Sequence, residues 1–135
     1  MTLLALFAAA TLFGGMLLYS FGFAPLVFSK LPVTDASRLL REAFPFYYLF
    51  VIAVALVAGV ALLGVDSLSA WLMFVTLVIG VAARQLLMPA INRASDARAA
   101  GDAAAGGRFK RLHGFSVALN FVQLAAVGVV LARFV

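Results

Sequence analysis

Apolar residues fill four long stretches of the chain, and most charged residues lie in the segments between them. A helix needs roughly 20 apolar residues to cross the hydrocarbon core of a bilayer. Each stretch meets this length, with charge only at Arg84 near the end of the third and at Arg133 at the end of the fourth. The pattern predicts transmembrane helices over residues 3–28, 44–65, 67–91 and 112–133. We therefore expect an all-α integral membrane protein, a four-transmembrane-helix bundle that forms a single domain over residues 1–135.

The polar segment between the first and second stretches has the period of an amphipathic helix. It predicts a short interfacial helix over residues 35–43 that lies along the membrane surface, with Thr34 and Asp35 as its cap. Arg38 and Glu42 are four residues apart and are expected to form an ion pair on its wet side. The apolar side holds Ala36, Leu39, Leu40 and Ala43, and the polar side holds Ser37, Arg38, Arg41 and Glu42.

Composition supports the membrane class. Hydrophobic residues make up 66% of the chain and charged residues only 11%, whereas soluble domains carry about 25% charge. The absence of cysteine excludes disulfides and thiolate-bound metals, and the single histidine, His113, excludes a site that needs two imidazoles from one chain. The net charge of +5 does not predict a nucleic-acid partner, because the basic residues flank apolar stretches instead of forming a soluble basic face.

The basic residues indicate the orientation of the chain. Four spans divide the connecting segments into two sides, and eight of the ten basic residues fall on one side, against Arg133 alone on the other. The positive-inside rule predicts that the basic side is cytoplasmic and that both termini are periplasmic, in a bacterial inner membrane. Five of these cations are expected to contact lipid headgroups: Arg38, Arg41, Arg108, Lys110 and Arg111.

Polar residues inside the spans are the candidate functional side chains. Four of them recur at spacings of three and four along the fourth stretch, and such residues face the bundle interior because lipid cannot satisfy their hydrogen bonds. Tyr19 lies at a similar depth in the first span, and Pro89 leaves a polar break at the end of the third. We predict a polar network, or a ligand site, formed by Tyr19, Arg84, Gln85, Asn92, His113, Ser116, Asn120 and Gln123.

Four ordered fragments carry a resemblance to a known family. They are GGMLLYSFGFAPLVF in the first span, FPFYY at the start of the second, LMPAINR at the end of the third and RFKRLHGFSVALN at the start of the fourth. The chain resembles the transmembrane protein 205-like family, also known as domain of unknown function 4149. This resemblance implies a four-helix membrane protein without a settled activity. The layout is also similar to that of membrane proteins of copper and haem handling, which rely on histidines absent here. The matching positions are Gly15, Pro25, Phe28, Pro45, Tyr48, Pro89, Asn92, His113 and Asn120.

The leading hypothesis for function is association without catalysis. The sequence contains no nucleophile with a recognisable base and orienting group, so we do not expect an enzyme. Small residues such as Gly15 and Gly59 allow helices to approach closely. We expect a homo-oligomer or an accessory subunit of a membrane complex, with membrane lipids and other membrane subunits as partners.

Two alternatives remain open. The first is a translocator of small solutes or ions, whose polar path would be lined by Tyr19, Arg84, His113, Asn120 and Gln123. The second is a b-type haem protein with His113 as an axial ligand. No other cofactor and no metal site are predicted, because Met16, Met73 and Met88 lie on different helices and make no paired thioether motif.

Overall fold

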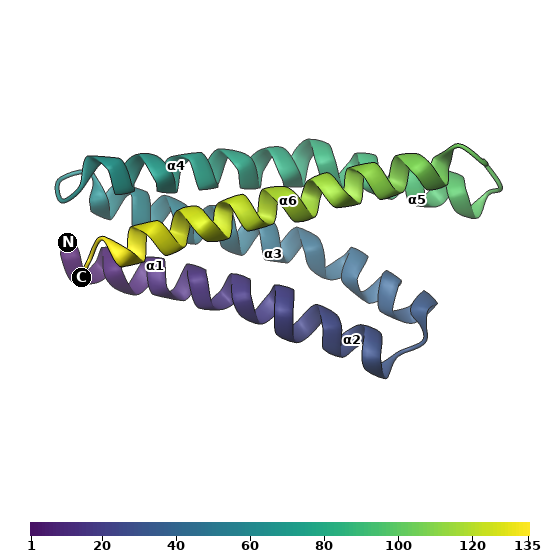
Figure 1. The fold of residues 1–135 in the computed structure, drawn as a ribbon, viewed down its shortest axis with the longest axis horizontal. Helices are drawn as coiled ribbons and strands as arrows, with labels where there is room; N and C mark the ends of the chain where they lie inside the picture. The colour runs from purple at the N-terminus through teal and green to yellow at the C-terminus, as the bar shows by residue number, and fades with distance from the viewer.

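The computed structural model describes residues 1–135, which form four helical rods joined by short turns (Figure 1). All four rods are long and apolar enough to cross a membrane. The predicted all-α membrane bundle with four spans is therefore confirmed. The first rod consists of α1 (Thr2–Leu17), the π-helical η1 (Leu18–Phe23) and α2 (Ala24–Lys30), and the second of α3 (Val33–Leu62). The third consists of α4 (Ser67–Ala82), the π-helical η2 (Ala83–Leu87) and α5 (Met88–Ala99), and the fourth of α6 (Ala105–Ala132).

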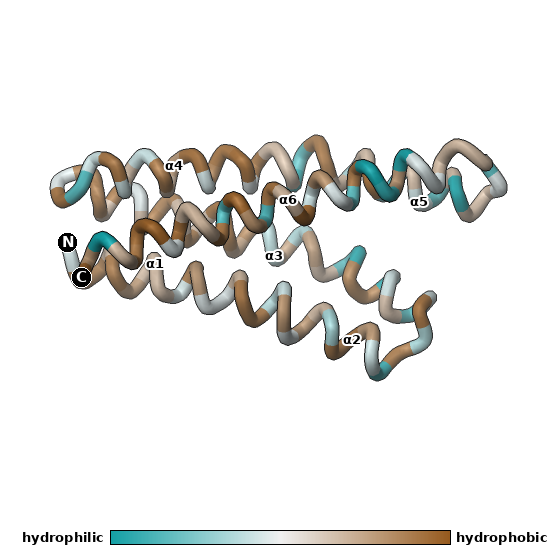
Figure 2. The backbone as a smooth tube through the Cα atoms, viewed as in Figure 1, coloured by the Kyte–Doolittle hydropathy of each residue, from teal (hydrophilic) through white to brown (hydrophobic).

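The two ends of the bundle differ in what they hold. Both termini and the turn between α3 and α4 lie at one end, and the connections α2–α3 and α5–α6 lie at the other (Figure 1). Teal, hydrophilic segments gather around α5 and the first turns of α3 and α6 (Figure 2). We call α1, α4 and residues 49–62 and 122–132 the packed half. The remaining elements, which are η1, α2, η2, α5 and residues 33–48 and 105–121, are the open half.

Small side chains let the helices of the packed half approach closely. A Cβ atom on Gly15 of α1 would lie 2.5 Å from the Cζ atom of Phe50 on α3. A Cβ atom on Gly59 of α3 would lie 3.2 Å from the ring of Phe74 on α4. In lipid, such packing replaces the hydrophobic effect as the force that holds helices together. The buried core of this half includes Ala5, Ala9, Leu12 and Met16 of α1, Val51, Ala55 and Ala58 of α3, Ala70 and Met73 of α4, and Val127 and Val130 of α6.

An ion pair closes the packed half at its outer end. Arg133, which follows α6, donates from Nε to Asp66 Oδ2 at 2.6 Å and from Nη2 to Asp66 Oδ1 at 3.0 Å. Asp66 also caps α4, accepting from the hydroxyl of Ser69 at 2.6 Å and from the backbone N–H of Leu68 at 3.2 Å. These hydrogen bonds, those from Arg133 first, hold the pKa of Asp66 well below its usual range.

The separate interfacial helix predicted over residues 35–43 is absent, because one helix runs from Val33 to Leu62. Its apolar side packs on α2 instead of resting on the membrane surface, and Ala36 and Leu40 form a small buried cluster with Val27. Pro45 removes one backbone donor without ending the helix.

Two local expectations for this segment are also wrong. The helix begins one residue before Thr34, with Pro32 at its N-cap and no side-chain cap. Arg38 donates to Asp35, three residues back, at 3.1 Å, and does not pair with Glu42. Asp35 lies in the first turn, where a negative charge is favoured by the helix dipole.

The fourth transmembrane helix is predicted over residues 112–133, but α6 begins earlier, at Ala105, with Ala104 at its N-cap and no side-chain cap. In the turn before it, the Asp102 carboxylate accepts from the backbone N–H of Ala104 at 2.9 Å and from Arg108 at 3.1 Å. Only Gly101 has a positive φ, of 95°, a conformation that glycine adopts without strain.

A π-helical segment precedes a proline in two of the four rods. η1 ends just before Pro25 and η2 just before Pro89, so each proline occupies the first turn of the α-helix that follows. A proline removes the N–H that would bond one turn back, and a π-helical turn lets the chain reassign the carbonyls left free. Both segments lie where the packed half gives way to the open half.

Candidate functional site

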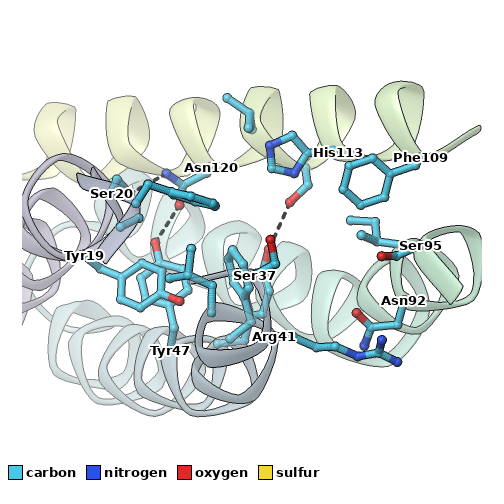
Figure 3. Close-up of a pocket in the computed structure, with 18 of the residues that line it drawn as sticks. Tyr19, Ser20, Ser37, Arg41, Tyr47, Asn92, Ser95, Phe109, His113 and Asn120 are labelled. Atoms are coloured by element: carbon cyan, nitrogen blue, oxygen red, sulfur yellow. Dashed lines mark hydrogen bonds between the residues drawn. The ribbon is translucent and has the colours of Figure 1, made fainter. Parts of the chain in front are cut away.

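A cavity of about 570 Å³ lies between the helices of the open half. One side of it is formed by η1, α2 and the first turns of α3, and the other by α5 and the first half of α6 (Figure 3). It exists because α2 packs on α3 and α5 packs on α6, while these two pairs of helices stand apart (Figure 1). The site is therefore a gap between two helical hairpins.

Asn120 organises the polar inner end of the cavity. Its Oδ1 atom accepts a hydrogen bond from the hydroxyl of Tyr47 at 2.6 Å, and its Nδ2 atom donates to the Ser20 hydroxyl at 3.0 Å (Figure 3). Tyr48 and Ser116 share a further hydrogen bond, 3.3 Å between their hydroxyl oxygens. The amide thus joins η1, α3 and α6 at the depth where the two halves meet.

Tyr19 brings an aromatic surface and an unsatisfied hydroxyl to the same place. Its ring stacks on that of Tyr47, with centroids 4.2 Å apart, and meets Phe44 edge-on at 5.6 Å. Its hydroxyl is buried and has no hydrogen-bond partner. Native structures seldom leave a buried polar atom unpaired, so such an atom points to a group that binds there.

Arginines line the mouth of the cavity. Arg41 on α3 reaches across to Asp96 on α5, with its Nη1 atom 2.6 Å from Oδ1 and its Nη2 atom 3.0 Å from Oδ2. The guanidinium of Arg98 on α5 lies 4.5 Å from the ring centroid of Phe109 on α6. Arg38 is the third arginine of the lining, and no acidic residue lines the cavity. The mouth therefore presents positive charge and hydrogen-bond donors.

His113 lies on the wall of the cavity near its mouth. Its ring is parallel to that of Phe109, with 2° between the planes and 5.8 Å between centroids (Figure 3). The side chain is exposed. No three His, Cys, Asp or Glu side chains lie close enough together to hold a metal ion.

The remaining residues of the predicted network lie elsewhere. Gln123 is buried in the packed half, where its Nε2 atom donates to the backbone carbonyl of Thr76 at 2.8 Å. Arg84 donates from Nε to the carbonyl of Pro45 at 3.4 Å, and Gln85 is exposed. Asn120 and Gln123 lie on one stripe of α6 but form hydrogen bonds with different neighbouring helices. The cavity brings together Tyr19, Asn92, His113, Ser116 and Asn120 from the predicted set.

The five residues predicted to contact lipid headgroups also fall into two groups. Arg38 and Arg41 line the cavity. Arg108, Lys110 and Arg111 are exposed on the first turns of α6, outside the lining. Arg108 pairs with Asp102, whose pKa is lowered by the backbone N–H of Ala104 and then by the guanidinium. The cationic surface at this end of the bundle is thus wider than the cavity mouth.

Sequence reasoning missed several residues of the cavity. Tyr47 donates to Asn120 at the inner end, and Ser95 and Arg98 continue the face of α5 that begins at Asn92. The spacing of Asn92, Ser95 and Arg98, three residues apart, was a readable helical stripe. The role of Tyr47 had no such signal, since aromatic residues are common at span ends for their interfacial preference.

Comparison with known proteins identifies the family. Residues 7–100 match the family described as Domain of unknown function (DUF4149). The chain belongs to this family. No curated protein and no solved structure matches it. The matched residues include the second and third rods and the first rod from Phe7 onward, so the family region contains all of the cavity lining except the part formed by α6.

Proposed function

We propose that this DUF4149 protein is a non-catalytic membrane protein that holds a membrane-dissolved amphiphile in the cavity between its two hairpins. We place it in the bacterial inner membrane with both termini periplasmic and the cavity in the cytoplasmic leaflet. The hypothesis from the sequence was association with copies of the chain or with other membrane subunits. The cavity favours a different partner, a small amphiphilic molecule.

The cavity is the observation that carries this proposal. Its volume of about 570 Å³ falls within the range of roughly 300–1,000 Å³ typical of small-molecule sites. Aromatic side chains form much of its wall, and polar side chains from α5 and α6 share it. A site that combines aromatic and polar surface suits a molecule that has both characters.

The arrangement of charge supports the orientation. The cavity mouth and the connections next to it hold Arg38, Arg41, Arg98, Arg108 and Lys110, and the opposite end holds Arg133 in its pair with Asp66. Cationic loops remain on the cytoplasmic side of bacterial inner membranes. The cavity would then open beside the headgroups of the cytoplasmic leaflet.

The hydrogen bonds in the cavity favour binding over catalysis. Ser116 has a tyrosine hydroxyl as its partner, which is a poor general base, and the lining contains no carboxylate. Asn120 uses both ends of its amide to hold Tyr47 and Ser20. These groups are arranged to fix the shape of the inner end.

Three other hypotheses receive less support. The glycines that favoured an oligomer are used inside the bundle, where Gly15 meets Phe50 and Gly59 meets Phe74. A translocation path would have to continue through the packed half, which is filled there by side chains such as Leu12. A haem would have His113 as its only histidine ligand from this chain, and a visible spectrum tests this directly.

Filling the cavity tests the proposal. Val117 lines it and is 41% exposed, whereas Val122, five residues along the same helix, is 54% exposed and lies outside the lining. We expect Val117→Trp to reduce the number of lipids that remain bound in native mass spectra after annular lipids are stripped, and Val122→Trp to leave it unchanged. Equal retention by both variants and the wild type would overturn the proposal.

A further inference from the structure

The mouth of the cavity has one arginine free to meet an anion. Of the three lining arginines, Arg38 pairs with Asp35 and Arg41 with Asp96, whereas Arg98 makes no ion pair. Phe109 supports the guanidinium of Arg98 from one face, 4.5 Å from the ring centroid. A guanidinium held in this way keeps its N–H groups free for a phosphate or a carboxylate.

Neutral donors accompany this charge. Asn92 lies about two turns and Ser95 about one turn before Arg98 on the same helix, and both line the cavity with it. Arg41 faces them from α3 and donates two hydrogen bonds to the carboxylate of Asp96. The mouth therefore contains, at Arg98, Asn92 and Ser95, donors that can bind an anionic headgroup.

A second, independent feature lies deeper. Tyr47 is six residues beyond Arg41 on α3, roughly 9 Å along the helix axis, and Tyr19 stacks on Tyr47. The hydroxyl of Tyr19 is buried without a partner. It can donate to an acceptor that enters from the cavity, and a carbonyl oxygen is the acceptor that a lipid places just below its headgroup.

From these two features we infer that the cavity binds an anionic glycerophospholipid, with its phosphate at Arg98 and an ester carbonyl at the Tyr19 hydroxyl. This inference rests on the proposed function and names its ligand. The acyl chains follow the aromatic wall formed by residues such as Phe28 and Phe44 and leave between the two hairpins. Charge selects the headgroup, and the buried hydroxyl selects the ester linkage.

The test of charge compares phosphatidylglycerol with phosphatidylcholine of identical chains, mixed equally in nanodiscs that contain the purified protein. The wild type should retain phosphatidylglycerol preferentially in native mass spectra. Arg98→Gln should lower this preference about fivefold, as expected for one cation near the surface. Arg98→Lys should keep most of it. Arg93→Gln is the matched control, because Arg93 is an exposed arginine of α5 outside the cavity.

The test of the hydroxyl uses ether-linked phosphatidylglycerol, which lacks the ester carbonyls. The wild type should bind the ester lipid a few times more tightly than the ether lipid, the effect of one net hydrogen bond. Tyr19→Phe should bind both equally. Because this variant keeps the aromatic ring, its folding is not at risk, and its melting temperature in the same detergent checks this.

The possible results separate the inference from the proposed function. If the wild type retains lipid without a headgroup preference, or if Arg98→Gln behaves like Arg93→Gln, the inference is overturned while amphiphile binding stands. If inorganic phosphate at millimolar concentration displaces the bound lipid, a soluble anion is the ligand and the inference is likewise overturned. If Val117→Trp retains as much lipid as the wild type, the cavity is not the site and both fail.

Discussion

The same four rods pack tightly at one end of the bundle and separate at the other. In the packed half, small and flexible residues such as Ala9, Met16 and Gly15 of α1 let α3 and α6 come close. In the open half, η1 and α6 meet through large rings, such as Phe21 and Phe121 at 6.0 Å, and an ion pair bridges α3 and α5. The difference in side-chain size accounts for the separation of the helices around the 570 Å³ cavity of the open half.

The boundary between the halves coincides with the two π-helical segments. η1 contributes no buried residue, although α1, directly before it, buries five. A π-helical turn rotates the residues that follow relative to the preceding helix, so the face that packs in α1 does not continue through η1. Pro25 and Pro89 thus mark the place where tight packing ends. The position of the cavity therefore depends partly on these interruptions of the α-helical backbone.

The largest effect on stability is expected in the packed half. Leu12 is fully buried there, and Leu12→Ala should lower the free energy of unfolding by about 2 kcal/mol or more, because the packed neighbours cannot collapse into the space. Val117→Ala at the cavity should cost less than about 0.5 kcal/mol, as its site is already open. Unfolding in mixed micelles with increasing sodium dodecyl sulfate measures both. Equal costs would contradict the contrast between the halves.

A smaller difference in the free energy of unfolding is expected between substitutions of two polar residues of α6. Gln123→Leu removes the buried hydrogen bond to the Thr76 carbonyl and should cost about 1 kcal/mol, the usual size for such bonds in membranes. Asn120→Leu should cost less, because water or ligand in the cavity can satisfy Tyr47 and Ser20. It should instead reduce lipid retention, which Gln123→Leu leaves unchanged. The same unfolding assay and native mass spectra distinguish the two.

The smallest expected effect is the pH dependence of stability that comes from ion pairs at the two ends of the bundle. The pKa of Asp66 is held low by Arg133 and Ser69. The ion pair of Asp66 with Arg133 therefore stabilises the fold fully at pH values above the usual pKa of a carboxylate, and this stabilisation is lost as the pH falls through the lowered pKa. Melting temperatures at pH 7 and pH 3 should differ more for the wild type than for Asp66→Asn. Asp102→Asn should change this difference less, since Asp102 binds residues within six positions and Asp66 binds Arg133 across the bundle. A reversed order would contradict this assignment.

The sequence predicted the four helices and their order well, because long apolar runs leave a chain in lipid few alternatives. It failed for the segment 35–43, where an apolar side suits a membrane surface and the neighbouring α2 equally. It also placed the start of the fourth helix at residue 112, whereas α6 begins at Ala105, directly after the turn in which Asp102 accepts from the backbone N–H of Ala104.

The candidate site was harder to predict for a related reason. His113, Ser116, Asn120 and Gln123 form one stripe, and periodicity says only that they face inward. Whether an inward residue meets a neighbouring helix, as Gln123 does, or a cavity, as Asn120 does, depends on how far apart the helices stand. That separation depends on contacts between distant residues such as Gly15 and Phe50, and a single sequence does not pair them.

An experimental structure of the protein purified with its native lipids tests the central claim most directly. We predict elongated density between the α2–α3 and α5–α6 hairpins, with one end at Arg98 and with none inside the packed half. Hairpins closed on one another, with Phe109 and His113 packed against Phe44 and no space between them, would contradict the account.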